Sequence, residues 1–553
     1  MRMKLIVALL LAWPLSLPAA TRMETLMVPM RDGVKLSTDV YLPGEGRFPV
    51  IVVRTPYNKD GIKSQCGYFA EHGYGCVAQD VRGRFRSEGE FYAFVNEGLD
   101  GYDTIEWAGA QPWSDGKVGT FGGSYLAWDQ YFASMYSPPH LVAMFALVGG
   151  TAFYDEYAYP GGTPNLGWPV WILNSARTSR QSERLDTIMK SGMMDWLKLS
   201  PAEREKTFDG FPAQKKMYRD FYAHPTFDSY WKQRGFWTAG YYGEMKDVPV
   251  FFVTGWYDYF GNGAIDVFRS LSARQKAPKK LLVGPWPHGT GGTVCGDASF
   301  GEMAAADQRA LAVDWFDHWM KGRSFTGISE QTVRYFRMGG GDGSKTSDGK
   351  MNHGGAWKTA ASYPLPGAGQ LNYYLHGSRA LSKQSPAAAS PSRYRFVASD
   401  PAPTIGGRYN IGNTPMCPQD QRPLDSRKDI LSFTSSALAE PLDVTGRPRV
   451  RLWVSSDAPS TDFTAKLIDV YPSGYAMHIA DGQLRIQPTG KEITEVVIDL
   501  GYTSSLFTAG HRLRVDISSS NYPKFETNPH NANNVVYHEP AHPSRIELPT
   551  LKP

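Results

Sequence analysis

The chain has 553 residues, of which 42% are hydrophobic and 20% charged, and its formal net charge is +4. This length exceeds that of an ordinary single domain, and the composition is typical of a globular protein and excludes wholesale disorder. Because the net charge is small and no run of lysine and arginine stands out, the sequence predicts no nucleic-acid partner.

Residues 1–20 have the order of a secretory signal peptide. Two basic residues precede the apolar stretch Leu5–Leu17, and small residues follow it. The apolar stretch is too short to span a bilayer comfortably, and Pro14 interrupts it. We therefore expect export to the periplasm or the medium and no membrane association after the signal peptide is cleaved. The sequence does not define the cleavage site. An uncleaved membrane anchor is the alternative.

Short apolar runs alternate with helix-like segments from about residue 21 to 148, and the same pattern resumes over 247–330. Alternation of this kind predicts a largely parallel sheet covered by helices on both faces. Helices are expected at 98–110, 125–136 and 264–277. Strands are expected at 50–53, 76–78, 117–121, 141–148, 248–253 and 280–283.

The remaining segments differ from this pattern in composition and periodicity. Residues 149–246 are rich in Tyr, Trp and Pro and then become helical and charged, which predicts a helical cap that covers the sheet edge and shapes a pocket. From about 331 to 553, apolar and polar residues alternate between Gly, Pro, Asn and Ser turns, as in 513–517. This pattern predicts a C-terminal β-sandwich or jelly roll.

Four cysteines allow three disulfide pairings. Cys295 and Cys417 both lie in loop-like surroundings, so a bridge between them is the preferred pairing. Cys76 lies inside an apolar run and is expected to be a small core residue, with Cys66 unassigned. No pair has the spacing of zinc ligands, so we predict no metal site.

Three residues in the order of an α/β-hydrolase triad each follow a predicted strand: Ser124, Asp258 and His288. A serine hydroxyl is a weak nucleophile until an imidazole accepts its proton and a carboxylate orients that imidazole. Asp258 and His288 are one helix and one strand apart, so both are expected at the carboxyl edge of the sheet, where ligands bind. Asp247 and Asp266 are competing carboxylates, the first at the wrong end of its strand and the second within a helix.

Ser124 is expected at a sharp turn from strand to helix, where free helical N–H groups face the reacting carbonyl. Gly122 and Gly123 carry no side chain that would block this turn. Leu126 stands where the Gly-x-Ser-x-Gly pattern has its second glycine, so a serine that merely caps a helix is the alternative.

Local motifs resemble those of the CocE/NonD-type serine hydrolases, the family that contains cocaine esterase, α-amino acid ester hydrolases, glutaryl-cephalosporin acylases and X-prolyl dipeptidyl peptidases. The resemblance covers nearly the whole mature chain. It rests on residues 28–36, 54–57, 79–84, 105–107, 111–116, 122–125, 420–422, 455–457, 461–463 and 518–521.

The resemblance implies an α/β-hydrolase core with an inserted helical cap and a C-terminal jelly roll. It implies that Ser124 is the nucleophile, His288 the general base and acid, and Asp258 the orienting carboxylate. The oxyanion hole then consists of the Tyr57 hydroxyl and the backbone N–H of Tyr125, and no cofactor is needed. Ala127 replaces a glycine that is common in the family, a change expected to alter helix packing slightly.

In α-amino acid ester hydrolases, extra carboxylates near the site bind the substrate ammonium. Here Tyr259 and Phe260 follow Asp258, which argues against such a preference. Asp155 and Glu156 could supply the missing charge, although a solvated loop pair is the favoured interpretation. The aromatic cap predicts an apolar or aromatic acyl group. The candidate substrate-binding residues are Asp155, Glu156, Trp168, Trp171, Tyr259 and Phe260.

The sequence thus predicts an exported serine hydrolase that cleaves small-molecule esters or amides through an acyl-enzyme. Alternatives are an X-prolyl dipeptidyl peptidase, an α-amino acid ester hydrolase or, more distantly, a catalytically inactive carbohydrate-binding protein. Assembly into a homo-oligomer stays open.

Overall fold

A computed structural model describes residues 22–552 except 180–181, 290, 326–331, 410, 412–413 and 489–491. The predicted signal peptide, residues 1–20, lies outside the described residues. Within these ranges no helix combines the length and the apolar character that a membrane span requires.

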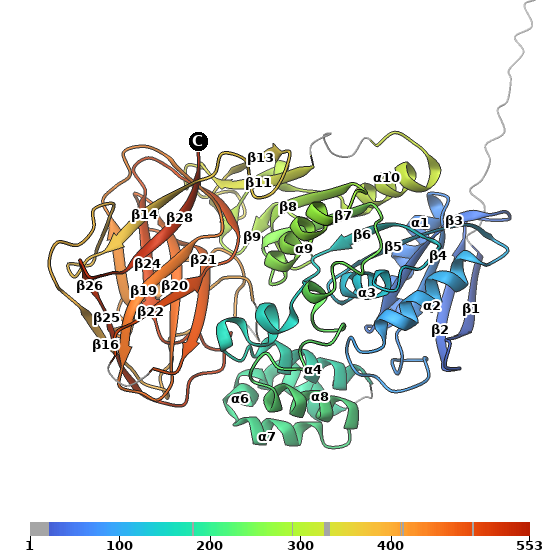
Figure 1. Cartoon of the computed structure of the whole chain (residues 1–553), viewed down its shortest axis with the longest axis horizontal. Coiled ribbons are helices and arrows are strands. Elements are labelled where there is room, and N and C mark those ends of the chain that lie inside the picture. The colour runs from blue at the N-terminus through green and yellow to red at the C-terminus, as the bar shows by residue number, and fades with distance from the viewer. Residues whose placement is uncertain are drawn as a thin grey trace, which may run out of the picture.

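A mixed sheet with parallel central strands forms the core (Figure 1). Neighbouring strands are parallel from β4 to β11, whereas β1, β2 and β13 run antiparallel to their neighbours. All six predicted core strands are confirmed. In spatial order the sheet contains β1 (Arg22–Pro29), β2 (Lys35–Leu42), β4 (Gly75–Asp80), β3 (Phe48–Thr55), β5 (Ser114–Gly123), β6 (Leu141–Leu147), β7 (Val250–Tyr257), β8 (Lys279–Pro287), β11 (Val333–Gly339) and β13 (Gly355–Ala360).

Helices cover both faces of this sheet, as the alternating pattern predicts. Helices α1 (Lys63–Glu71) and α10 (Gln308–Lys321) bury their apolar side chains against one face, and α2 (Glu97–Gly109), α3 (Tyr125–Ser134) and α9 (Gly261–Arg274) against the other. The three predicted helices are confirmed, with ends that differ by at most three residues. Burial of these apolar faces, at about 25 cal/mol per Å², is the main force that holds helices to sheet.

The segment between β6 and β7 folds into the predicted helical cap, and its helices cluster beside the sheet edge (Figure 1). One helix start is encoded locally: Ser200 accepts a hydrogen bond from the Glu203 N–H, and the Glu203 carboxylate accepts one from the Ser200 N–H. The cap contains α4 (Gly167–Ser179), α5 (Glu183–Thr187), α6 (Met193–Lys198), α7 (Pro201–Glu205) and α8 (Pro212–Ala223).

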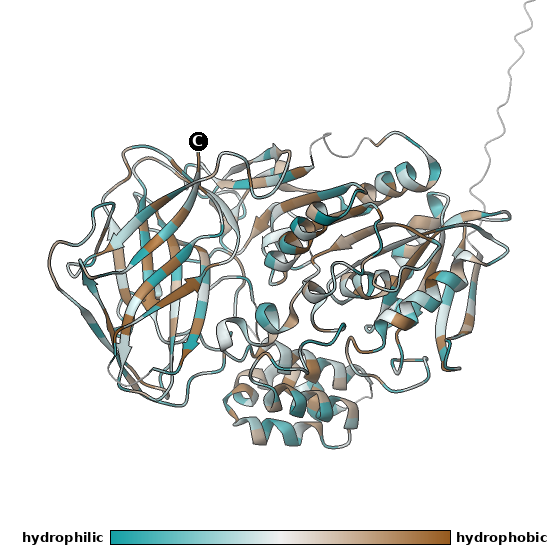
Figure 2. Cartoon of the chain, in the orientation of Figure 1, coloured by the Kyte–Doolittle hydropathy of each residue, from teal (hydrophilic) through white to brown (hydrophobic). Residues whose placement is uncertain are grey.

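The C-terminal part is an antiparallel β-sandwich. One layer is built around β19 (Arg449–Ser456), which pairs with β22 (Thr494–Asp499), β25 (Ala532–Val536) and β28 (Arg545–Leu551). The other is built around β20 (Thr461–Val470), which pairs with β21 (Ala476–Ile486) and β24 (Arg512–Ser518). Apolar residues of β19 and β24 are fully buried in a shared core, and Figure 2 shows hydropathy alternating along these strands.

Strand β11 joins the two parts of the molecule. It pairs in parallel with β8 of the core sheet and, through its last residues, with β23 (Thr503–Phe507) of the sandwich. The core sheet therefore continues past residue 330, where the sequence placed the start of the β domain.

Two disulfides are present, and one corrects an expectation. The preferred bridge, Cys295–Cys417, is confirmed, with Cα atoms 5.4 Å apart. Cys76 is buried as expected but is not a free core thiol, because it is bonded to Cys66 across a Cα separation of 5.3 Å. Helix α1, which the sequence did not reveal, turns back onto β4 and brings the two residues within disulfide reach.

Candidate active site

Ser124 lies at a strained turn between β5 and α3. Its φ of 60° and ψ of −125° are unfavourable for a residue with a side chain. The N–H of Ser124 donates to the Leu147 carbonyl at 3.0 Å, which fixes the turn to the neighbouring strand. Gly122 is required here, since a Cβ on it would lie 2.4 Å from the Leu126 Cβ. The turn presents the Ser124 side chain at the carboxyl edge of the sheet.

Asp258 and His288 meet at the same edge. Asp258 follows β7 and is 0% exposed, and its Oδ2 lies 2.5 Å from Nδ1 of His288. The Phe260 N–H donates to the other oxygen, Oδ1, at 2.7 Å. A carboxylate held from both sides orients the imidazole and leaves Nε2 for proton transfer. The Tyr259 ring stacks on the imidazole with centroids 4.0 Å apart.

Tyr57 and Tyr125 lie beside Ser124. Although Tyr57 is 44% exposed, its hydroxyl accepts a hydrogen bond from Trp171 Nε1 at 3.0 Å and lies within hydrogen-bonding reach of the Ser124 side chain. Loss of hydration raises the pKa of the Tyr57 phenol to about 12, so the hydroxyl keeps its proton and remains a donor. Tyr125 is the first residue of α3, where a backbone N–H has no intrahelical acceptor.

All of these residues except the buried Asp258 line one cavity of about 280 Å³. Ser124 and His288 lie in its wall, and the rest of the lining is aromatic. Four candidate substrate-binding residues, Trp168, Trp171, Tyr259 and Phe260, are among the lining residues. The others are Tyr57, Phe94, Tyr125, Trp128, Phe153 and Tyr157.

Asp155 and Glu156 lie elsewhere, in the wall of a neighbouring cavity of about 840 Å³ between the cap, the core and the β domain. They are not a loop pair, because residues 154–158 form a single π-helical turn. Asp155 is exposed, whereas the Glu156 carboxylate accepts hydrogen bonds from the N–H groups of Thr151 and Ala152. Glu156 thus stabilises its own turn, and burial raises the pKa of its carboxyl well above the usual value.

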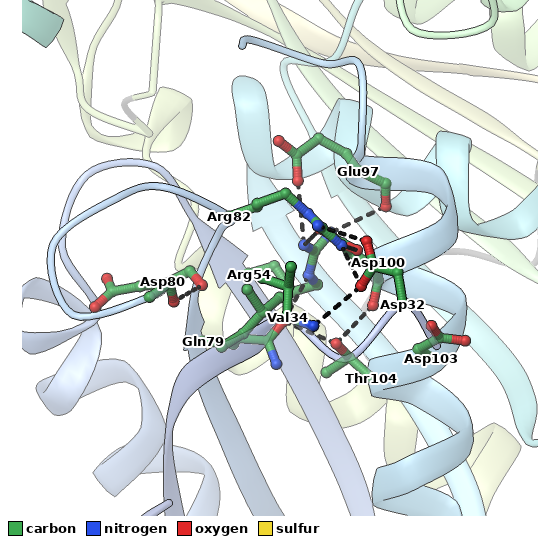
Figure 3. A network of polar contacts seen from close by, with 12 residues as sticks. Asp32, Val34, Arg54, Gln79, Asp80, Arg82, Glu97, Asp100, Asp103 and Thr104 are labelled. Carbon is green, nitrogen blue, oxygen red and sulfur yellow. Dashed lines mark hydrogen bonds and ion pairs between the residues drawn. The ribbon is translucent and has the colours of Figure 1, made fainter. Parts of the chain in front are cut away.

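A polar network that includes the buried Arg54 and Glu97 is connected to Tyr125, and Figure 3 shows the part of it around Arg54, Arg82 and Asp100. Arg54 forms an ion pair with Glu97 at 3.1 Å and donates to Gln79 at 2.9 Å. The same Glu97 carboxylate accepts the Tyr125 hydroxyl at 2.8 Å. Arg82 continues the network through Asp100 at 2.7 Å. The motifs at 54–57 and 79–84 therefore anchor the residue that follows Ser124.

Four aromatic residues of the cavity wall were not among the candidates from the sequence: Phe94, Trp128, Phe153 and Tyr157. Trp128 has a usable signal, since it follows Ser124 by four residues and lies on the same helical face. Phe94 lies in a turn, and Phe153 and Tyr157 lie at or in the π-helical turn at 154–158. The path of both segments depends on tertiary packing, so no local pattern marks these residues. Ala127 is accommodated because its Cβ faces Gly149, where an added Cβ would lie only 2.7 Å away.

No cluster of three or more His, Cys, Asp or Glu side chains is placed to hold a metal ion in the part of the chain that the structure describes.

Two family models and a curated relative match most of the chain. The family model of the X-Pro dipeptidyl-peptidase (S15 family) matches residues 32–290, and that of the X-Pro dipeptidyl-peptidase C-terminal non-catalytic domain matches residues 326–547. Cocaine esterase from Rhodococcus sp. (strain MB1 Bresler) is 32% identical, over 96% of this chain and 98% of that protein.

Solved structures share the fold along the full length. An aminopeptidase from the marine sediment archaeon Thaumarchaeota archaeon superposes with a TM-score of 0.82 at 22% identity, covering 96% of this chain and 97% of its own. An α-amino acid ester hydrolase superposes with a TM-score of 0.80 at 22% identity, covering 98% of this chain and 100% of its own.

Proposed function

Because the chain belongs to the CocE/NonD family of serine hydrolases, we propose that it cleaves carboxylic esters or amides through an acyl-enzyme on Ser124. The observation that carries the assignment is the 2.5 Å contact between Asp258 and His288 at the cavity that Ser124 lines. In this proposal His288 is the general base and acid, and Asp258 is its orienting carboxylate.

The chemistry proceeds in two halves. Ser124 Oγ attacks the carbonyl carbon while His288 Nε2 accepts its proton, and the resulting oxyanion is held by the Tyr57 hydroxyl and the Tyr125 N–H. The bond to the leaving group then breaks as His288 returns the proton to it. Water attacks the acyl-enzyme with His288 again as base, which releases the acid and restores Ser124.

The aromatic cavity supports a neutral, apolar or aromatic acyl group. Its volume of about 280 Å³ suits a short aliphatic or single-ring acyl chain, and aromatic walls favour burial of such a group. Among its described lining residues there is no carboxylate to balance an ammonium. This argues against Xaa-Pro dipeptides and α-amino esters, whose free N-terminus would need a negative partner.

A hydrolysis panel on residues 21–553, with Ser124→Ala as the blank, tests the proposal. The panel pairs acetyl and benzoyl esters with α-amino esters, acyl amides and Xaa-Pro anilides. We expect turnover of neutral esters, labelling of Ser124 by a fluorophosphonate, and neither in the Ser124→Ala variant. Wild-type turnover by that variant would refute the nucleophile, and a preference for ammonium-bearing substrates would refute the substrate class.

We also propose export. Its support is the signal-like order of residues 1–20 together with two disulfides, which persist in oxidising compartments. Fractionation of expressing cells tests this, because a chain that stays full-length in the cytoplasm would contradict it.

A further inference from the structure

The cap and the proposed oxyanion hole are joined by one hydrogen bond that the catalytic assignment does not use. Trp171, on cap helix α4, donates its Nε1–H to the Tyr57 hydroxyl at 3.0 Å. An indole nitrogen is a donor only, so the Tyr57 oxygen is the acceptor. The single phenolic hydrogen of Tyr57 is therefore left for another acceptor, and the Ser124 side chain lies within its reach.

We propose that Trp171 is a positioning residue that directs the Tyr57 O–H toward the oxyanion. The inference rests on the proposed role of Tyr57 and adds a residue that acts through it. With the Trp171 N–H on the oxygen, the hydroxyl has one orientation rather than several, and its O–H is polarised. Preorganised donors of this kind stabilise a developing oxyanion because they need no reorientation during the reaction.

Packing around Trp171 fixes the indole. Its ring stacks on Trp168 with centroids 4.7 Å apart and planes 11° apart. It is also nearly parallel to the Tyr125 ring, with planes 6° apart and centroids 6.0 Å apart. Trp171 is thus held between its own helix and the residue that follows Ser124.

A second set of hydrogen bonds joins the loop that carries Tyr57 to helix α4. The buried Arg84 donates to the Pro56 carbonyl at 2.9 Å, to the Ser175 carbonyl at 3.1 Å and to the Thr178 hydroxyl at 2.8 Å. Pro56 precedes Tyr57, whereas Ser175 and Thr178 belong to α4. The loop that carries Tyr57 and the cap helix that carries Trp171 therefore share a fixed spacing, so cap position is coupled to the oxyanion hole.

A double-mutant cycle tests the inference. At position 171, 3-benzothienylalanine keeps the bicyclic shape and replaces the N–H with sulfur. Trp171→Phe is a second variant that needs no unnatural residue. Each is measured with Tyr57 and with Tyr57→Phe, on 4-nitrophenyl acetate, whose small acyl group limits direct contact with the cap. Thermal unfolding of every variant checks folding, and Trp453→Phe, in β19 of the sandwich, is the control.

We expect the isostere to lower kcat by about 3- to 10-fold with Tyr57 present, the range of one neutral hydrogen bond, and to leave KM within about twofold. With Tyr57→Phe the same change is expected to have almost no effect, because the acceptor is gone. An equal loss of kcat on introducing the isostere with Tyr57 and with Tyr57→Phe would overturn the inference. It would also be overturned if the isostere left kcat unchanged while Tyr57→Phe lowered it. If Tyr57→Phe is itself fully active, the proposed oxyanion hole fails and the inference fails with it.

Discussion

Replacement of Asp258 by asparagine would test the triad most directly. In the native site Oδ1 accepts the Phe260 N–H at 2.7 Å and Oδ2 faces His288 Nδ1. In Asp258→Asn, only the amide oxygen can accept the Phe260 N–H, so the NH₂ must face Nδ1. The imidazole then accepts at Nδ1 and carries its proton on Nε2, the atom that has to take the proton of Ser124.

A base held in the wrong tautomer costs about 10⁴ in kcat in sites of this type, or about 5.4 kcal/mol at 1.36 kcal/mol per tenfold. The assay is kcat and KM for 4-nitrophenyl acetate from pH 7 to 9, with thermal unfolding to confirm an intact fold. Asp247→Asn is the matched control, because Asp247 precedes β7 at the opposite end, where it accepts the N–H groups of Lys276 and Ala277 and pairs with Lys279. A folded Asp258→Asn enzyme that loses less than about tenfold would refute the assignment.

Three further outcomes are expected. Tyr57→Phe lowers kcat by about 10²- to 10³-fold and leaves KM nearly unchanged, since the lost bond forms mainly in the transition state; steady-state kinetics decide this. Loss of the Cys295–Cys417 bridge, which spans 122 residues, lowers the free energy of unfolding by about 5 kcal/mol, whereas loss of the Cys66–Cys76 bridge, which spans 10, lowers it by about 3 kcal/mol. Urea unfolding of the Cys→Ser variants measures both losses, and a larger loss for the Cys66–Cys76 bridge would contradict the prediction. Burial lowers the pKa of His353 to about 3, so between pH 6.5 and 3 the unfolded chain binds a proton at this residue and the folded chain does not. The contribution of His353 to the free energy of unfolding therefore falls by about 2 kcal/mol as the pH is lowered from 6.5 to 5. That slope is expected to flatten in His353→Gln.

Features with a local cause were predictable from the sequence. The buried parallel strands appear as apolar runs, and Ser124 is marked by the glycines that allow its turn. Asp258 and His288 follow from the rule that parallel strands end at one edge, and the structure does bring them into contact. Their catalytic role stays a prediction until variants are measured.

Features that depend on contacts between distant segments were not predictable. The Cys66–Cys76 bridge needs the fold of α1 onto β4, and the β11–β8 pairing crosses the domain boundary that sequence texture suggested. A sequence pattern gives the type of residue, whereas its partner is set by packing.

The strained turn at Ser124 explains why motifs far from the triad accompany it. A residue with positive φ costs about 1–3 kcal/mol, so the surrounding structure has to hold it in place. Glu97 accepts the Tyr125 hydroxyl, and Arg54 in turn holds Glu97. A hydrogen bond to a charged group contributes about 1.5–3 kcal/mol, so this network alone is of the size needed to offset the strain. Arg54 of the 54–57 motif is thus a structural support of the Ser124 turn, and its substitution should damage kcat through the geometry of the turn rather than through contact with substrate.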